Sequence, residues 1–127
     1  MEPKKYIQDY NQGLGIEFSI AVLCYRTEKE IIPFIEKLHQ IMNLYRFKWE
    51  IVVVANYWKN SKDLTPEIAK HLSEKLDNVR YIAESKEGGM GWDMKRGLDA
   101  CQGHYIGVID GDGQFPVENI FSCFAKI

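Results

Sequence analysis

The segment Trp49–Ala55 reads WEIVVVA, and its centre, Ile51–Val54, is an unbroken run of β-branched side chains. A strand with one face in water alternates apolar and polar residues, whereas a strand covered on both faces is apolar throughout. We therefore predict a buried central strand over this segment. Such a strand is typical of a parallel sheet that carries helices on both faces.

Further strands and helices alternate along the chain on both sides of this segment. Runs of β-favouring apolar residues predict three more strands, Glu17–Cys24, Val79–Ala83 and His104–Ile109. Helices are predicted to begin near Ile32, at Thr65-Pro66-Glu67 with the threonine as cap, after the turn Gly88–Gly91, and at Pro116. This order predicts an α/β fold with three layers, in which a Rossmann-like, mostly parallel sheet has helices on both faces.

The composition limits the class of protein. The chain has 127 residues, a net charge of −2 and 46% hydrophobic residues, which is the size and make-up of one globular domain. Because there is no basic surplus to neutralise phosphates, we expect no nucleic acid partner. No apolar run approaches the roughly 20 residues of a membrane-spanning helix. The cysteines Cys24, Cys101 and Cys123 form no C-x-x-C pair, which predicts free thiols and a cytoplasmic location.

Two acidic residues follow the last predicted strand, in the sequence Asp110-Gly111-Asp112-Gly113-Gln114. Ligands of parallel α/β sheets bind beyond the carboxyl ends of the strands, where this segment lies. Two neighbouring carboxylates suit Mg²⁺ or Mn²⁺, which bind one or two carboxylates together with substrate phosphates. The alternative is a simple polar turn, since Asp-Gly pairs are common in turns. A calcium-binding EF-hand is excluded, because Phe115 and Phe121 occupy its required glycine and glutamate positions.

A glycine-rich turn lies before the third predicted helix, within the segment Lys86–Gly97. It matches neither standard phosphate-binding motif, and a tight strand-to-helix turn is the favoured interpretation. We expect the charges of Lys86, Lys95 and Arg96 to be solvated. Two aromatic residues, Tyr25 and Trp58, follow the first and second strands, where they would contact a ligand or anchor a loop.

Together these segments resemble the N-terminal half of a family 2 glycosyltransferase with a GT-A-type nucleotide-sugar domain. The branch most similar to the chain contains the dolichyl- or polyprenyl-phosphate sugar synthases. The most specific segment is Gly88–Ile120, which has the glycine turn, the G-L-x-x-A-x-G-x-Y pattern and the D-x-D-x-Q signature of that family. Ser19–Leu38, Glu50–Ala55 and Ser61-x-Asp63-x-Thr65 resemble its earlier strands, helix and loop.

The resemblance implies transfer of a sugar from a UDP- or GDP-sugar to a polyprenyl phosphate or a glycan. Residues 1–16 would be an N-terminal lead. Residues 17–127 would be the N-terminal part of a truncated GT-A domain that carries the donor-binding half. Asp110 and Asp112 would hold Mg²⁺ or Mn²⁺, and Asp110 would lie by the ribose or the same metal. The implied nucleotide-sugar contacts are Leu23, Tyr25, Asn56, Asp110, Gly111, Asp112 and Gln114.

The chain departs from the family pattern at several positions. Leu23, Arg26 and Thr27 stand where the family has proline, asparagine and glutamate, and Ala55-Asn56 replaces a pair of aspartates. An asparagine carbonyl can still accept a hydrogen bond from a base. The catalytic base is unknown, because the family supplies it from a later segment. Association with the inner face of a membrane and homo-oligomerisation are both left open.

Two alternative functions follow from these departures and from the order of the elements. A non-catalytic, truncated or degenerate nucleotide-binding module of the same fold is the main alternative to a transferase. A phosphoacceptor domain with a flavodoxin-like fold would need acidic residues after the first strand. Cys24-Tyr25-Arg26 supplies none.

Overall fold

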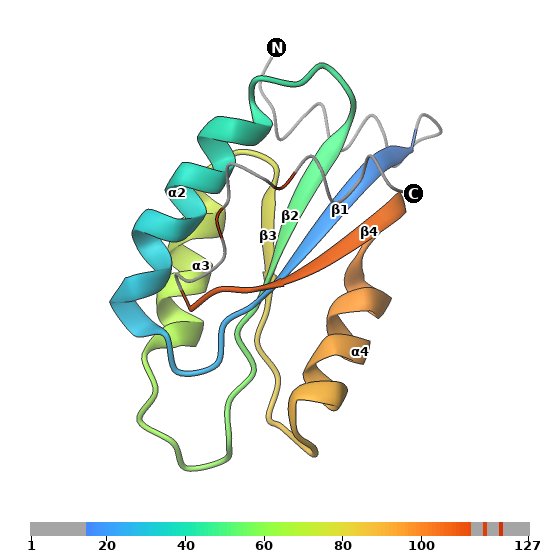
Figure 1. Ribbon diagram of the computed structural model, residues 1–127. Coiled ribbons are helices and arrows are strands. Elements are labelled where there is room, and N and C mark those ends of the chain that lie inside the picture. The colour runs from blue at the N-terminus through green and yellow to red at the C-terminus, as the bar shows by residue number, and fades with distance from the viewer. Residues whose placement is uncertain (1–14, 113–115, 117–119, 121–127) are drawn as a thin grey trace.

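The computed structural model describes residues 15–112, 116 and 120. Within this part of the chain, four parallel strands form one sheet in the order β3-β2-β1-β4 (Figure 1). Their bounds are β1 Ile16–Leu23, β2 Trp49–Val54, β3 Val79–Ile82 and β4 Gly103–Asp110. The predicted central strand is β2, which is buried at every position and pairs on both edges.

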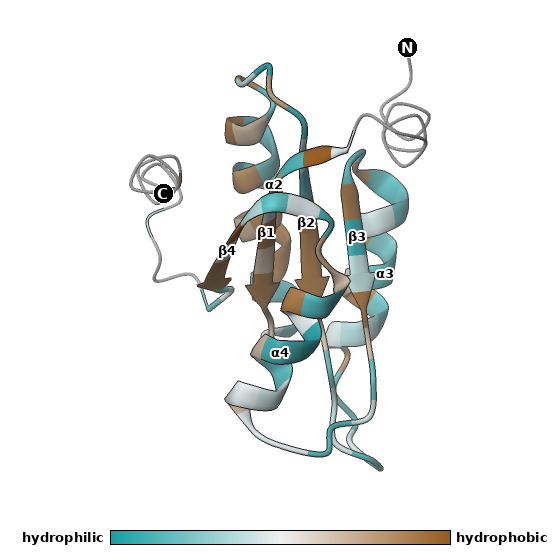
Figure 2. Ribbon diagram, turned by 90° about the vertical axis from the view of Figure 1, so that its right-hand side faces the viewer, coloured by the Kyte–Doolittle hydropathy of each residue, from teal (hydrophilic) through white to brown (hydrophobic). Residues whose placement is uncertain are grey.

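Helices cover both faces of the sheet, as predicted. They are α2 Ile31–Met42, which follows the short 3-10 helix η2 Glu28–Glu30, α3 Thr65–Lys75 and α4 Met90–Ala100. Helices α2 and α3 lie together on one face, and α4 lies alone on the other (Figure 1). Figure 2 views the molecule from the α4 side and shows this helix in front of the hydrophobic centres of β1 and β2.

The alternation of side chains along β1 builds two separate apolar clusters. Ile20 and Val22 point into the larger cluster, beneath α2 and α3, while Ala21 and Leu23 point toward α4. Helix α4 approaches the sheet closely at Gly97, where an added Cβ would lie 2.9 Å from the Val54 side chain. The carboxyl half of β1, Ile20–Leu23, is therefore apolar on both faces, because helices cover each of them.

Several predicted boundaries differ from the structure by one or two residues. Strand β1 begins at Ile16, which was assigned to the lead, and β4 ends at Asp110, which was predicted to open a loop. The cap of α3 is also corrected: Leu64 is the N-cap and Thr65 is the first helical residue, whose amide donates to Asp63 Oδ1 at 3.0 Å. Most of the helix predicted from Pro116 lies outside the described residues, as does the lead through residue 14.

A buried acidic residue joins the strands at their amino ends. The Glu50 side chain is fully buried and accepts hydrogen bonds from Ser19 Oγ at 2.7 Å, Arg80 Nε at 2.8 Å and the Gln102 amide at 2.8 Å. Three strands and the connection from α4 to β4 therefore converge on this carboxylate. The network stabilises the end of the sheet that lies opposite the loops after the strands.

Candidate functional site

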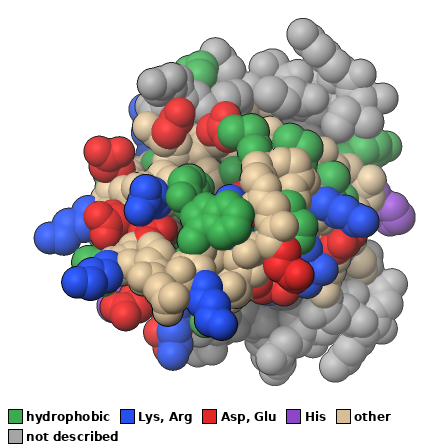
Figure 3. All heavy atoms as spheres, turned by 90° about the horizontal axis from the view of Figure 1, so that it is seen from below, with side chains coloured by type: hydrophobic (Ala, Val, Ile, Leu, Met, Phe, Trp, Pro, Cys, Tyr) green, Lys and Arg blue, Asp and Glu red, His purple; other side chains and the backbone are tan. Residues whose placement is uncertain are grey.

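The loops that follow the four strands meet at the carboxyl edge of the sheet, where parallel α/β folds bind ligands. A cleft of about 370 Å³ opens there. Figure 3 looks onto this edge and shows hydrophobic side chains at its centre, surrounded by charges of both signs. The residues lining the cleft are Leu23, Cys24, Tyr25, Thr27, Val54, Asn56, Trp58, Lys86, Gly89, Met90, Asp93, Asp110 and Asp112.

The backbone at Gly111 determines where the two aspartates lie. Its amide donates to the Leu23 carbonyl at 2.9 Å, which extends the pairing of β4 with β1 by one residue. An added Cβ at Gly111 would lie only 2.8 Å from Cys24 Sγ and 2.9 Å from Val22 Cγ1. The glycine is therefore buried against β1, while Asp110 and Asp112 on either side of it are exposed and line the cleft.

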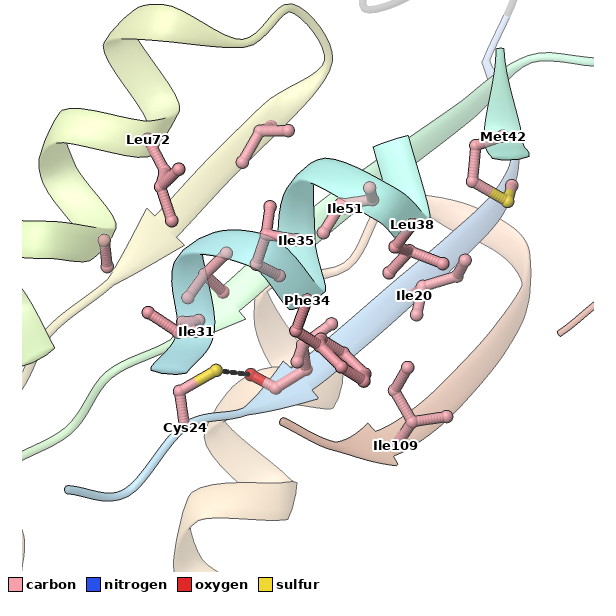
Figure 4. Packing of buried hydrophobic residues seen from close by; sticks show 14 of the residues in the cluster. Ile20, Cys24, Ile31, Phe34, Ile35, Leu38, Met42, Ile51, Leu72 and Ile109 are labelled. Atoms are coloured by element: carbon pink, nitrogen blue, oxygen red, sulfur yellow. Dashed lines mark hydrogen bonds between the residues drawn. The ribbon is translucent and has the colours of Figure 1, made fainter. Parts of the chain in front are cut away.

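Cys24 lies directly behind this glycine. Its thiol is buried and donates to the Val22 carbonyl at 3.3 Å (Figure 4). Burial, and then the charge of Asp110, raise the pKa of the Cys24 thiol well above its usual range. The thiol therefore stays neutral, and it serves as a small packing group behind the glycine and not as a nucleophile.

A network of buried polar side chains lies at the base of the cleft. Asn56 Nδ2 donates to Asp93 Oδ1 at 2.9 Å, and Asn56 Oδ1 accepts the Glu84 amide at 2.9 Å. The Lys86 ammonium forms an ion pair with the other oxygen of Asp93. The network thus joins the loops after β2 and β3 to the first turn of α4.

The position of Lys86 overturns the expectation that its charge is solvated. Its side chain is 4% exposed, and that of Asp93 is 9% exposed. The ammonium lies 4.5 Å from the centre of the Tyr25 ring and 5.4 Å from that of Trp58, which is within cation–π range of both. The buried position is sustained because Asp93 supplies the opposite charge.

Arg96 keeps an exposed side chain, as expected, and it lies outside the residues that line the cleft. Its guanidinium donates to both carboxylate oxygens of the half-exposed Glu84, at 2.9 and 2.6 Å. These hydrogen bonds lower the pKa of Glu84. The pair ties α4 to the loop after β3 at the side of the network.

The predicted site residues that fall within residues 15–112 lie together at the cleft. Leu23, Tyr25 and Asn56 line the cleft with the two aspartates, and Gly111 lies beneath it. Both polar atoms of Asn56 already have protein partners, so its predicted contact with a base would have to use its remaining hydrogen-bonding capacity. Gln114 lies outside the described residues.

The sequence reasoning missed Asp93, and it assigned Lys86 to the solvent. A signal was present in the sequence, because Lys86 and Asp93 flank the glycine turn. This turn reverses the chain between β3 and α4 and brings the two side chains together.

The possible metal ligands within the described residues are few. No group of three or more His, Cys, Asp or Glu side chains comes close enough there to hold a metal ion. Asp110 and Asp112 provide two hard carboxylate ligands at the cleft. Two protein carboxylates fit a divalent cation that takes its other ligands from water and a bound phosphate.

Comparison with known proteins places these features in context. A family model described as "Glycosyl transferase family 2" matches residues 19–127. A dodecaprenyl-phosphate galacturonate synthase of Rhizobium johnstonii is 27% identical, over 100% of this chain and 36% of its own. A dolichol-phosphate mannosyltransferase of Saccharomyces cerevisiae is 28% identical, over 90% of this chain and 42% of its own. The chain thus spans about two-fifths of these relatives at most.

A solved structure shares the fold. The crystal structure of S. aureus TarS 1-349 in complex with UDP-GlcNAc superposes with a TM-score of 0.63 and 26% sequence identity. The match covers 87% of this chain and 30% of that chain. The parallel sheet with helices on both faces is therefore a GT-A-type arrangement.

Proposed function

This chain belongs to glycosyl transferase family 2, and we propose that its carboxyl-edge cleft binds the nucleotide diphosphate of a sugar donor together with a divalent cation. The observation that carries the proposal is the pair of exposed carboxylates, Asp110 and Asp112, which Gly111 positions on the cleft. Mg²⁺ or Mn²⁺ commonly binds to one or two carboxylates and to substrate phosphates, which is the set of ligands that this arrangement would offer.

The chemistry of the proposed reaction is transfer of a sugar from that donor to a lipid-phosphate or glycan acceptor. A bound cation neutralises the charge of a leaving diphosphate. Tyr25 is a partly exposed aromatic residue that lines the cleft, which suits contact with a nucleobase. Leu23 and Val54 supply apolar walls. The described residues would therefore bind and orient the donor.

Two comparisons support the identity of the donor and the acceptor. The S. aureus TarS structure holds UDP-GlcNAc, and a second TarS structure that superposes with a TM-score of 0.63 holds UDP. The two relatives named above are a dodecaprenyl-phosphate galacturonate synthase and a dolichol-phosphate mannosyltransferase. We propose a nucleoside-diphosphate sugar, with uridine or guanosine as the nucleoside, and a polyprenyl phosphate acceptor at the membrane surface. No helix among residues 15–112 is long and apolar enough to cross a membrane.

Calorimetric titration tests the donor site. We expect UDP or GDP to bind with Mn²⁺ and to bind much more weakly with EDTA. Asp112→Asn should bind the nucleotide as weakly with Mn²⁺ as with EDTA, because the amide has no charge to offer the cation. Asp99→Asn is the matched control, since Asp99 is exposed on α4 and does not line the cleft. Nucleotide binding that is equal with and without Mn²⁺ would contradict the proposal.

A non-catalytic nucleotide-binding module of the same fold is the second candidate. The observation that favours it is that Asn56, which replaces an expected aspartate, has both polar atoms bonded to Asp93 and Glu84. Incubation of the chain with UDP-GlcNAc and a short-chain polyprenyl phosphate, followed by mass spectrometry of the lipid, separates the two. Formation of the glycosylated lipid would exclude the non-catalytic module.

A further inference from the structure

The loop between β2 and α3 exposes two large apolar side chains. Trp58 is 43% exposed and Leu64 is 47% exposed, although both residue types are buried in most proteins. The loop projects beyond the carboxyl ends of the strands (Figure 1). Trp58 lines the cleft, whereas Leu64 does not. A ligand in the cleft therefore accounts for only one of the two exposed side chains.

Basic side chains accompany these apolar residues. Lys59 and Lys62 are exposed on the same loop. Arg26, in the loop after β1, is also exposed, and with Lys62 it lines a groove of about 350 Å³. The next exposed charges, those of Lys29 and Glu30 on η2, have opposite signs. We give the name tip surface to five residues, Arg26, Trp58, Lys59, Lys62 and Leu64.

The acidic side chains between these loops are hydrogen-bonded at the base of the tip surface. Asp63 Oδ1 accepts the Thr65 amide at 3.0 Å and its hydroxyl at 2.6 Å, and Asp63 Oδ2 is buried. Glu28 Oε2 accepts the Leu64 amide at 3.1 Å, and the Glu28 amide donates to Thr65 Oγ1 at 2.9 Å. These bonds join the loops after β1 and β2. The tip surface is therefore ordered in advance, and the charges at its end are basic.

The combination of side chains fits an anionic lipid surface. Tryptophan favours the boundary between headgroups and acyl chains, and an exposed leucine adds apolar area at the same depth. Each basic side chain near an anionic membrane strengthens binding by about fivefold. A nucleic acid partner fits less well, because the whole chain has a net charge of −2 and the tip surface adds exposed aliphatic area.

We propose that the tip surface docks the protein on an anionic bilayer, with its basic side chains among the headgroup phosphates and its two apolar side chains at the acyl boundary. The inference rests on the proposed function, since it states which face of the domain meets a membrane-borne acceptor. Because Trp58 also lines the cleft, docking would hold the mouth of the cleft at the headgroups, where the phosphate of a polyprenyl acceptor lies.

Co-sedimentation of the full chain with vesicles tests this surface. We expect binding to vesicles that contain phosphatidylglycerol and phosphatidylcholine, and much weaker binding to phosphatidylcholine alone. Lys59→Gln/Lys62→Gln should weaken the binding about twenty-fold, as two successive fivefold losses. Lys70→Gln/Lys95→Gln makes the same change at exposed lysines of α3 and α4. Its effect should stay within about twofold, because charges held away from the bilayer are screened by salt.

A pair of leucine variants tests the apolar contact. Leu64→Gln should weaken vesicle binding by about threefold or more, because it removes apolar area that the bilayer would bury. Leu44→Gln is the matched control and should bind as the unaltered protein does. Leu44 is 79% exposed, but it lies between α2 and the amino end of β2, at the opposite end of the sheet. Urea midpoints confirm that all four variants are folded.

Three results would overturn the inference. They are equal or absent binding to the two kinds of vesicle, equal losses in the two lysine pairs, and equal losses in the two leucine variants. Nucleotide binding with Mn²⁺ is measured on the same preparations. Nucleotide binding without vesicle binding overturns this inference alone, whereas the absence of both overturns the proposed function with it.

Discussion

Replacement of Gly111 by alanine is expected to destabilise the fold at the candidate site. The new Cβ would lie 2.8 Å from Cys24 Sγ and 2.9 Å from Val22 Cγ1, both of which are buried. Overpacking of this kind costs about 1–3 kcal/mol. The alanine recovers about 0.4–1 kcal/mol by restricting the unfolded chain, because the backbone at Gly111 does not have a positive φ. The middle of these two ranges gives a net loss of about 1.3 kcal/mol.

Urea unfolding followed by circular dichroism measures this loss. We expect a lower midpoint with an unchanged slope. Gly91→Ala is the matched control, because a Cβ there meets nothing within 4 Å, and it should leave stability unchanged or raise it by up to about 1 kcal/mol. Adding Cys24→Ala to Gly111→Ala removes the contacted sulfur, so the combined loss should be smaller than the sum of the single losses. A Gly111→Ala protein as stable as the parent, or strictly additive losses, would refute the steric explanation.

Three further predictions follow from the packing, the ion pair and the thiols. Gly97→Ala should lower the urea midpoint, unlike Gly91→Ala in the same helix, because its Cβ would meet the sheet at 2.9 Å; equal effects of the two would contradict this. Lys86→Met should cost about 3–5 kcal/mol by leaving the Asp93 carboxylate buried without a partner, and adding Asp93→Asn should restore part of it. An equal or larger loss in that double variant would be the contrary result. Burial, and then the charge of Glu50, raise the pKa of Cys101 to about 11. The unfolded chain therefore releases this proton first, so stability should fall as the pH rises from about 9 to about 11. Cys101→Ser should reduce that fall, and an identical pH profile would count against it.

The strands and the layers of the fold could be predicted because they depend on local pattern. A strand covered on both faces is apolar along its centre, and Ile51–Ala55 shows this without reference to the rest of the chain. Element ends were less accurate because partner strands set them. Asp110 belongs to β4, and not to a loop, because its backbone pairs with Leu23. That pairing cannot be read from residues near Asp110.

The buried charges were missed for a related reason. Lysine and glutamate are rarely buried, so composition favours solvent for Lys86 and Glu50. Both are nevertheless buried, because the fold supplies partners from other elements: Asp93 for Lys86, and Ser19 and Arg80 for Glu50. The cleft aspartates were easier to identify, since their position after a buried strand places them at the ligand edge.

The central claim is that a cation-bound nucleotide occupies the cleft beside Asp110 and Asp112, and paramagnetic broadening in an amide NMR spectrum tests it most directly. With Mn²⁺ and UDP or GDP, we expect the amide signals of Tyr25 and Gly111 to broaden. The amide of Gly103 lies at the other end of β4, about 23 Å away by the usual rise of a strand, and should stay sharp. The same titration with Mg²⁺ should leave all signals sharp, and Asp112→Asn should suppress the broadening. Broadening that is equal at both ends of the sheet, or stronger at Gly103, would contradict the assignment.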